Sequence, residues 1–490
     1  MKYLTSEMAE SLQPKRVWKY FYEISQIPRD SGEEQRARDY VKQFAHKHDL
    51  PYFIDSTGNI VVKRPGAPGK ERSAPVILQG HLDMVCVKDP DVSHDFAVDP
   101  IKLVIDGEWI TAEGTTLGAD NGIAVAFALA VLEDDTLSCG PIEALFTVSE
   151  ETGLDGAFKL DPSLLSGTSL INLDSEQEGV IYVGSAGGGE ITASLSAERE
   201  MTEGNCLDWS AWEVTVTGLT GGHSGGDIHL GRANAVAECF RFLYAVNSVS
   251  DIRIASADGG SKRNVIPNNC RAVFLVPPES AEAVSRLSEA FVPSFAQRFG
   301  DTDPKGSVKV TQTVLPDSCL KVEQSRRLIH GLFITPHGVD RMSTAVPGMV
   351  ETSTNLASVQ TDAREIRIVT SQRSSIESAR NYMSQRVAAA LAVTGAATKE
   401  ENTYPAWTPD PASPLPELVS RVYERMYRKK PTITAIHAGL ECGVIKSKAP
   451  EIQAVSMGPT IHDAHSTDER MFIPSVQRVY EFLRELLQSC

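Results

Sequence analysis

Residues 76–83 read VILQGHLD, an apolar run that ends in a glycine, a histidine and an aspartate. Two further apolar runs, 142–148 and 170–173, are each closely followed by an acidic residue. Between the first two runs, residues 122–133 (GIAVAFALAVLE) are rich in helix-forming side chains. Strands that alternate with helices predict a mostly parallel sheet. The expected fold class is α/β.

Ionisable side chains follow the predicted strands. His81, Glu150, Glu151 and Asp174 each lie at or just beyond the end of an apolar run. In open parallel sheets, ligands bind beyond the carboxyl ends of the strands. We therefore expect these four side chains to gather at one edge of the sheet and to form a site.

The pattern changes after the glycine-rich stretch 184–189. A strand-strand-helix order is predicted within residues 251–291 and again within 350–393, which indicates a weak internal repeat. The proline-rich stretch 404–416 is typical of a linker. The simplest organisation is one domain formed by residues 1–186 and 402–490, with residues 187–401 inserted as a second domain of two related halves.

Composition and charge disfavour several classes of function. The formal net charge of -17 at pH 7 disfavours a nucleic-acid partner, which needs a dense basic face. The longest apolar run, 123–132, is too short to cross a membrane, and the N-terminus lacks a signal-peptide core. We expect a cytoplasmic protein without a membrane partner. Its dispersed cysteines should be reduced thiols. They are Cys86, Cys139, Cys206, Cys239, Cys270, Cys319, Cys442 and Cys490.

A mixed set of imidazole and carboxylate groups forms the candidate metal site. Two histidines and three acidic residues suit zinc, with cobalt or manganese as substitutes. Taken singly, such a histidine is usually a hydrogen-bonded core residue and such acids are usually solvated. Their order and their positions at strand ends together favour metal binding. The candidate ligands are His81, Asp120, Glu151, Asp174 and His465.

Several longer strings carry a family resemblance. They are QGHLDMV at 79–85, GTTLGADNG at 114–122, SEETG at 149–153 and HAGLEC at 437–442. The sequence resembles the two-zinc exopeptidases that include aminoacylases, glutamate carboxypeptidases and carnosinases, and among them the carnosinase-type aminoacyl-histidine (Xaa-His) dipeptidases. The resemblance runs nearly end to end. It implies a zinc-exopeptidase catalytic domain with a mostly parallel mixed sheet flanked by helices, and an inserted α+β lid domain.

The resemblance also implies how the ligands divide between two metal ions. Asp120 would bridge the ions, with His81 and Asp174 completing one set of ligands and Glu151 and His465 the other. A bridging carboxylate can hold two cations about 3.5–4 Å apart, where they jointly polarise a carbonyl and acidify a shared water. The cofactor expected is therefore two Zn²⁺ ions per chain.

Two acidic residues have further implied roles in catalysis. Asp83 would accept the hydrogen bond of the second ring nitrogen of His81, fixing the tautomer of that ligand. Glu150 would act as the general base and then as the general acid, passing a proton from the water to the leaving amine. His462 could compete with His465 for the ligand role, but the family pattern favours His465, in the string HSTDE.

The inserted domain supplies the candidate substrate-binding residues. The string GGHSG at 221–225 matches a lid motif whose histidine, here His223, donates a hydrogen bond to the oxyanion of the tetrahedral intermediate. Asn264 and Arg373 match lid positions that bind the backbone and the terminal carboxylate of the substrate, and the planar guanidinium suits a carboxylate. Gly439 would add backbone contacts near the same end of the substrate.

Alternatives stay open at this point. The same metals could serve an aminoacylase-type amidohydrolase acting on N-acyl amino acids, and a peptide-binding relative could have lost catalysis. The glycine-rich stretches 184–189 and 221–226 lack the Lys-Ser/Thr of a phosphate-binding loop, so we reject a nucleotide site. The expected partner is a dipeptide substrate, Xaa-His among others. The active molecule is expected to be a monomer or a homodimer.

Overall fold

The computed structural model describes residues 2–204, 208–344, 346 and 348–490. These residues form two compact units. The first unit consists of Met1–Gly184, Trp407–Ala435 and Leu440–Cys490, and the second of Ser185–Ala406 and Ile436–Gly439. The chain passes between the units near residues 184 and 406, compared with 186 and 401 in the sequence analysis.

A mixed sheet of eight strands forms the centre of the first unit. Its central strands are parallel, because β4 pairs in parallel with β7 and β8, and β8 with β22. Antiparallel pairs such as β2–β3 and β22–β9 complete it. The predicted mixed α/β sheet is confirmed. In spatial order the strands are β2 (Tyr52–Ile54), β3 (Ile60–Arg64), β7 (Ile142–Thr147), β4 (Val76–His81), β8 (Ser169–Asn172), β22 (Gln453–Ser456), β9 (Val180–Ser185) and β21 (Thr432–Ile436).

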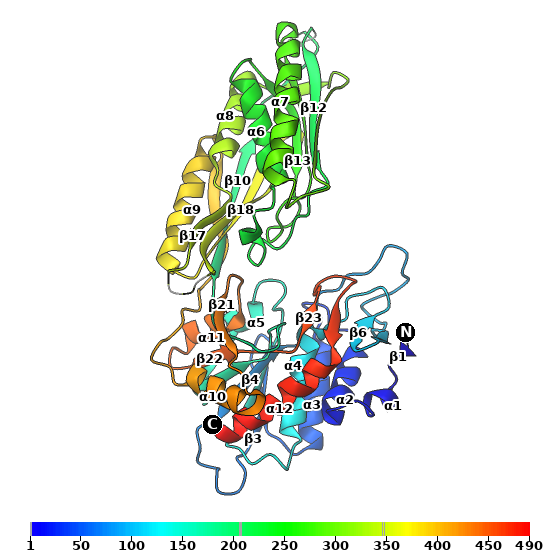
Figure 1. The fold of residues 1–490 in the computed structure, drawn as a ribbon, viewed down its shortest axis with the longest axis vertical. Helices are drawn as coiled ribbons and strands as arrows, with labels where there is room; N and C mark the ends of the chain where they lie inside the picture. The colour runs from blue at the N-terminus through cyan, green and yellow to red at the C-terminus, as the bar shows by residue number, and fades with distance from the viewer. Residues whose placement is uncertain (1, 205–207, 345, 347) are drawn as a thin grey trace. The chain divides into compact units, whose positions relative to one another are not determined.

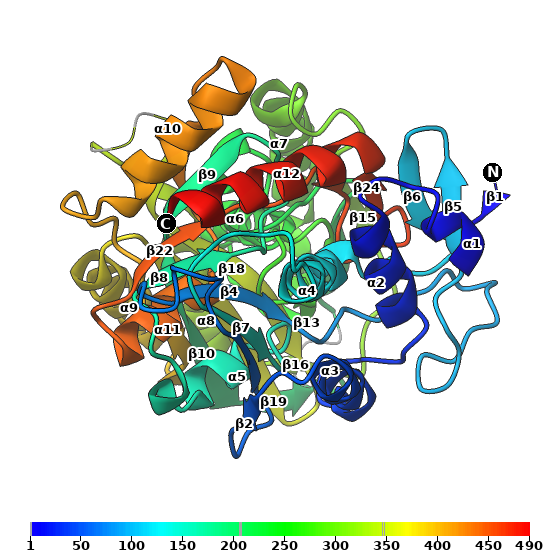
Figure 2. The same ribbon diagram turned by 90° about the horizontal axis from the view of Figure 1, so that it is seen from below.

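Helices cover both faces of this sheet (Figure 2). The helix α4 (Ala119–Leu132) packs on β4 and β7 and is buried on all sides from Asn121 to Leu132. A helix that is apolar all round belongs in a core, which explains why its sequence shows no polar stripe. The other helices are α1 (Ser6–Ala9), α2 (Lys15–Ser25), α3 (Gln35–Lys47), α5 (Asp155–Lys159), α10 (Leu415–Tyr427), α11 (Glu441–Lys448) and α12 (Ile473–Ser489).

A smaller sheet of five strands also belongs to the first unit. It orders β1 (Lys2–Tyr3), β5 (Leu103–Asp106), β6 (Trp109–Ala112), β24 (Arg470–Phe472) and β23 (Ile461–His462). The turn between β23 and β24 carries His465, so this sheet anchors a predicted metal ligand.

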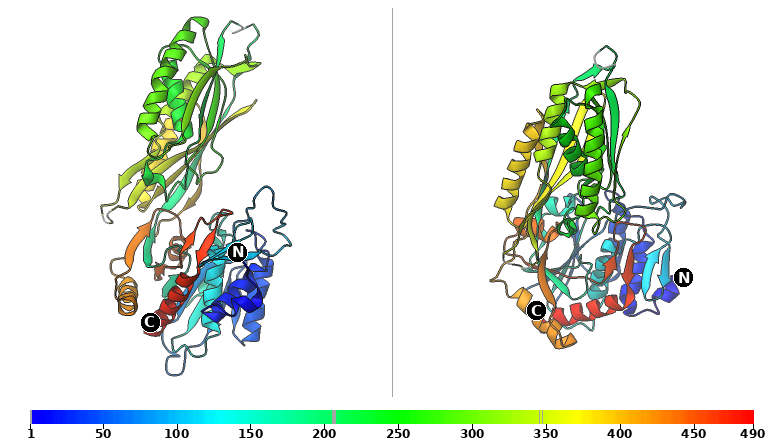
Figure 3. Two further views of the ribbon diagram at one scale, coloured as in Figure 1. Left: turned by 45° about the vertical axis from the view of Figure 1, so that its right-hand side comes forward. Right: turned by 45° about the horizontal axis from the view of Figure 1, so that its top comes forward.

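The second unit is an antiparallel sheet with helices on one face (Figures 1 and 3). The helices are α6 (Ala235–Asn247), α7 (Ala281–Phe299), α8 (Val322–Ile334) and α9 (Glu377–Ala392). The strands, in spatial order, are β15 (Ser307–Gln312), β12 (Ser210–Thr217), β14 (Cys270–Val276), β13 (Arg253–Gly259), β18 (Val350–Thr361), β19 (Glu365–Ser374), β10 (Gly187–Ser196) and β20 (Ala397–Tyr404), and β17 (Gly338–Met342) also pairs with β18.

The strand-strand-helix order occurs twice in this unit, as β13–β14–α7 and as β18–β19–α9. The two halves meet where β13 pairs with β18. The edge strand β20 crosses the predicted domain boundary at 401/402 and includes Tyr404, the first residue of the predicted linker. Because β20 is a polar edge strand, it lacks the alternating apolar pattern that predicts a strand.

Two observations concern the expected environment of the protein. Within the described residues, no helix is long and apolar enough to span a membrane. The cysteines that the structure describes form no disulfide with one another, and all but two of them are buried. Cys206 lies outside the described residues.

Candidate metal centre

His81 is the last residue of strand β4 and lies at the edge of the sheet. His81 pairs in register with Thr147, the last residue of β7, so the two strands end together. The His81 side chain is buried, and its Nδ1 lies 3.3 Å from Asp83 Oδ1. Asp83 therefore lies beside the second ring nitrogen of His81, although this nitrogen makes no hydrogen bond in the structure, so the expected hydrogen bond stays a prediction. The other nitrogen, Nε2, faces Asp120 and Asp174.

Asp120 lies in an irregular turn before α4. Gly118 adopts the left-handed conformation (φ 68°), and the regular helix begins only at Gly122. Two buried side chains hold this turn from other segments. Glu469 accepts backbone N–H groups from residues 117–120 at 2.8–3.4 Å. Arg29 donates to the Gly118 carbonyl at 2.5 Å. The backbone of the turn that carries Asp120 is thus held by two side chains.

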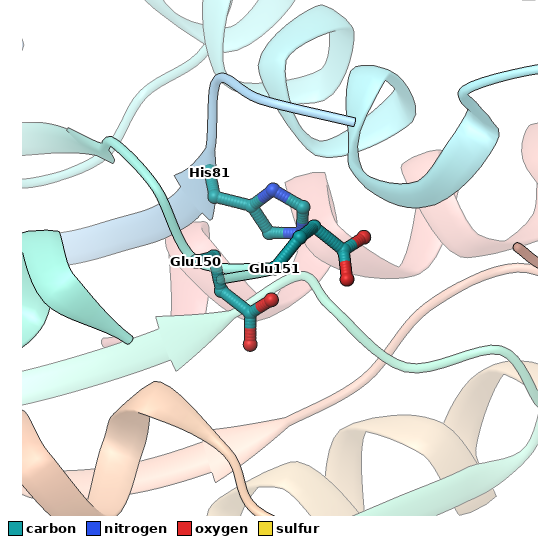
Figure 4. Close-up of side chains that lie close together, drawn as sticks. All are labelled: His81, Glu150 and Glu151. Atoms are coloured by element: carbon teal, nitrogen blue, oxygen red, sulfur yellow. The ribbon is translucent and has the colours of Figure 1, made fainter. Parts of the chain in front are cut away.

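The loop after β7 carries Glu150 and Glu151. Asp83 accepts the backbone N–H of both glutamates at 3.1 Å, so it holds this loop as well as His81. Ser149 is left-handed (φ 51°), and Glu34 accepts its backbone N–H at 2.8 Å. Figure 4 shows that the two glutamate carboxylates point in different directions beside His81. Neighbouring residues can therefore serve different functions.

Asp174 and His465 complete the cluster. Asp174 follows β8, and its Oδ1 lies 3.5 Å from His81 Nε2. His465 is left-handed (φ 64°), and its Nε2 lies 3.0 Å from Asp120 Oδ2 and 2.9 Å from Glu151 Oε1. His462 instead packs against Trp109, with ring centroids 4.9 Å apart and the rings tilted by 40°.

Asp120 is the centre of this arrangement. Its Oδ1 lies 3.0 Å from His81 Nε2, while its Oδ2 faces His465. The groups able to hold a metal ion are His81–Asp120–Asp174, Asp120–Glu151–His465 and His81–Glu150–Glu151. The first two share Asp120. A carboxylate with one oxygen facing each of two imidazole-containing groups is the donor arrangement that suits a pair of zinc-like cations.

The electrostatics of the cluster also fit cations. Burial raises the pKa of Glu150 well above its usual range, and the charge of Glu151 adds to this effect. Burial likewise raises the pKa of Asp174 to about 7. Burial opposes the charge of His465, but hydrogen bonds to Asp120 and Glu151 outweigh it and raise the pKa to about 12. Five carboxyl groups thus share two imidazoles, and divalent cations would compensate the excess of acidic groups.

Some residues of the site were not predicted from the sequence. Arg29, Glu34 and Glu469 hold the loops that carry the candidate ligands. Glu441 lies fully buried at the start of α11, where its Oε2 accepts hydrogen bonds from Gln79 at 2.5 Å and Thr147 at 2.7 Å. Glu469 lies in the sequence motif HSTDE and Glu441 in HAGLEC. Both motifs carry the family resemblance, so they could have indicated these residues as part of the site. Arg29 has no such signal.

The second unit gathers most of its predicted residues into another cluster. A Cβ atom built on Gly225 would lie 3.1 Å from the His223 ring and 3.3 Å from Arg373 Cδ, so the three residues are neighbours. His223 Nδ1 accepts the N–H of Gly226 at 2.9 Å, which leaves Nε2 as the protonated nitrogen of the neutral ring. Asn264 joins this loop through its backbone, where its carbonyl accepts the N–H of Ser224.

Gly439 lies beside the Tyr404 ring, which in turn contacts Arg373. The structure therefore brings His223, Arg373 and Gly439 into one region of the second unit. It connects Asn264 to that region through the loop 223–226.

Comparison with known proteins decides the family. Residues 77–489 match peptidase family M20/M25/M40. The chain belongs to this family. It is therefore a hydrolase acting on peptide bonds, and the resemblance stated from the sequence is confirmed.

Individual proteins align with this chain over almost its whole length. The chain is 40% identical to the cytosol non-specific dipeptidase of Escherichia coli over 99% of both sequences. The structure of an aminoacylhistidine dipeptidase from Vibrio alginolyticus is 37% identical, with a TM-score of 0.84 and coverage of 98% of this chain and 97% of that one. An M20 metallo-carboxypeptidase from Sulfolobus solfataricus shares the fold at 13% identity, with a TM-score of 0.55 and coverage of 96% and 98%.

Proposed function

We propose that this chain is a cytoplasmic dipeptidase that holds two divalent metal ions, zinc as the expected species, with Asp120 between them. The observation that carries the proposal is the arrangement of the Asp120 carboxylate, whose two oxygens face His81 and His465 separately. His81 and Asp174 would hold one ion, and Glu151 and His465 the other. Cobalt or manganese are possible substitutes because the donor set is mixed.

The relatives support a dipeptide as the substrate. The Escherichia coli relative is named a cytosol non-specific dipeptidase and the Vibrio alginolyticus structure an aminoacylhistidine dipeptidase. Both are similar to this chain along nearly its full length. We therefore infer that Xaa-His dipeptides are among the substrates and that the protein acts in the cytoplasm. The active molecule is a monomer or a homodimer.

Metal ions held by the five candidate ligands would supply Lewis-acid chemistry, which polarises a scissile carbonyl and acidifies a water molecule. Glu150 takes a proton from that water and returns it to the leaving amine. Its buried position beside Glu151 makes it a stronger base than a solvated glutamate, because both features raise its pKa. Asp83 keeps His81 and the Glu150–Glu151 loop in place, so one carboxylate orients both a candidate ligand and the base.

We further propose that the first unit is the catalytic domain and the second the lid. His223 would donate its Nε2 proton to the oxyanion as it forms, in keeping with the tautomer that the Gly226 contact requires. Arg373 would bind the free carboxylate at the C-terminus of the dipeptide. Asn264 and Gly439 would contact the backbone of the substrate.

A substrate panel tests the function directly. Metal-stripped protein would be given zinc, manganese or cobalt and assayed on dipeptides, including β-alanyl-histidine, on tripeptides and on N-acetyl amino acids. We expect hydrolysis of dipeptides only after metal is restored. Hydrolysis of N-acetyl amino acids in preference to dipeptides would support the aminoacylase alternative, and metal binding without hydrolysis of any substrate would indicate the inactive peptide-binding alternative.

A further inference from the structure

The glycine-rich stretch at 184–189, which matches no nucleotide loop, runs from the end of strand β9 into the first residues of strand β10. Gly188 lies directly between two functional neighbours in the sheet: it pairs with Arg373 of β19 on one side and with Tyr404 of β20 on the other. On the far side of Arg373, the next cross-strand partner is Ser353 of β18. Ser353, Arg373, Gly188 and Tyr404 therefore form one row across four strands. Directly paired residues of neighbouring strands present their side chains on the same face.

The missing side chain of Gly188 makes room for Tyr404. A Cβ atom built on Gly188 would lie within 2.5 Å of three atoms of the Tyr404 side chain, including the hydroxyl. The ring is confined on its other side as well, because a Cβ atom on Gly439 would approach it to 2.8 Å. Tyr404 is thus held between two glycines, and any side chain at position 188 would displace it.

The hydroxyl of Tyr404 meets the guanidinium of Arg373 across this gap. Arg373 Nη1 donates to Tyr404 Oη at 2.7 Å, which fixes the rotation of the guanidinium plane. Arg373 is buried, and its Nε has no hydrogen-bond partner. Among the described residues, no carboxylate forms an ion pair with Arg373. The hydrogen bond to Tyr404 uses Nη1 and leaves the Nε–Nη2 edge of the guanidinium available. A carboxylate can bind this edge bidentately.

The other end of the row is also polar and lacks negative charge. His437 Nε2 lies 2.7 Å from Ser353 Oγ. Burial and the neighbouring charges of Arg373 and His223 lower the pKa of His437 to about 3, so this imidazole is neutral at physiological pH. The buried Nε of Arg373 has no acceptor and its guanidinium has no counterion among the described residues, which is costly unless a ligand supplies the missing acceptor.

We propose that Tyr404 is a positioning residue for substrate specificity: held over Gly188, it orients Arg373 so that the Nε edge binds the free C-terminal carboxylate of the peptide. This inference rests on the proposed dipeptidase function and adds two residues, Tyr404 and Gly188, to the recognition of the substrate. Tyr404 acts through Arg373, so it should affect only substrates that carry the carboxylate.

The first test is Tyr404→Phe, which keeps the ring between the glycines and removes the hydroxyl. Catalytic efficiency would be measured on a dipeptide and on the same dipeptide with its C-terminus amidated. We expect a loss of roughly 10- to 100-fold on the free dipeptide, mainly through KM, and less than about 3-fold on the amide. In an Arg373→Ala background, the same change should have almost no effect on either substrate, because the residue it orients is absent.

The second test compares two glycines of the same strand. Gly188→Ala should reproduce the selective loss, because the added methyl group displaces Tyr404. Gly189→Ala is the matched control: its side chain would point to the opposite face, where the nearest atom, a methyl carbon of Thr403, lies 3.2 Å away. We expect the control to retain the preference of the wild type for the free carboxylate.

Equal losses on the free dipeptide and the amide, or no loss with either Tyr404→Phe or Gly188→Ala, would overturn the proposal. Failure of the dipeptidase function itself would be recognised separately, because the wild-type protein would then hydrolyse neither substrate.

Discussion

The two polar clusters of this protein differ in charge, in location and in how they are built. The cluster in the first unit contains an excess of carboxylates, lies on loops at the ends of strands and fits cations. The cluster in the second unit contains arginine and imidazole groups, lies on the face of a sheet and fits an anion. A dipeptide offers a partner to each: a carbonyl for the metal ions and a terminal carboxylate for the arginine. Under the proposed function, the first unit would hold the metal ions and the second would bind the terminal carboxylate, while His223 of the second unit would also take part in the chemistry at the oxyanion.

The largest effect expected from a change that spares the metal ligands is at Glu150. Glu150→Gln keeps the size of the side chain and removes the proton acceptor, so turnover should fall by roughly 10²–10⁴. Metal content, measured by elemental analysis, should stay that of the wild type. If turnover were unchanged, the base would have to be another group, and Glu151 would be the first to examine.

A double cycle sharpens the contrast between the clusters. Arg373→Ala should lower catalytic efficiency on a free dipeptide by roughly thirty- to several-thousand-fold, because it removes one partner of an ion pair. On the dipeptide amide, the catalytic efficiency of Arg373→Ala should be little lower than that of the wild type. His223→Ala should instead lower turnover on both substrates. Additive effects of Arg373→Ala and amidation would contradict the assignment of the carboxylate to Arg373, while the metal site would be unaffected.

A pH-dependent effect on stability is expected at Glu441, beneath the first cluster. Burial raises the pKa of Glu441 from 4.5 to about 7, which corresponds to about 3 kcal/mol. The folded state binds this proton more tightly than the unfolded state does. Below pH 4.5 Glu441 therefore does not lower the free energy of unfolding, and between pH 4.5 and pH 7 it lowers it progressively. In metal-free protein, Glu441→Gln should therefore raise the free energy of unfolding at pH 8 but hardly at pH 4. A pH-independent difference between the variant and the wild type would contradict this account.

A smaller effect is expected at Glu469, which holds the turn before Asp120. Glu469→Gln replaces one acceptor oxygen by a donor facing backbone N–H groups, and metal affinity should fall by roughly 10- to 100-fold. Glu143→Gln is the matched control, because buried Glu143 accepts the backbone N–H of Ser166 and Gly167. Chelator competition would measure affinity and thermal unfolding the loss of stability. Equal affinity losses in the two variants would show that Glu469 acts only through general stability.

The two clusters also differ in how far the sequence reveals them. His81, Glu151 and Asp174 could be predicted because each follows a recognisable strand, and Asp120 because it stands in a long motif. Tyr404 and Gly188 could not, because their meeting depends on the register of β10 with β19 and β20. Arg29 acts through backbone carbonyls far along the chain, a contact that no local pattern encodes. The parallel centre of the sheet was predictable from its apolar runs, whereas the polar strand β20 was not.

The central claim is that two metal ions share Asp120. The most direct test is to titrate metal-stripped wild type and Asp120→Ala with zinc while measuring bound metal and dipeptide turnover on the same samples. The account predicts that full wild-type activity requires two zinc ions per chain, and that Asp120→Ala loses activity together with most of its bound metal, because neither group of ligands is complete. An Asp120→Ala variant that binds about two zinc ions and remains fully active would contradict it.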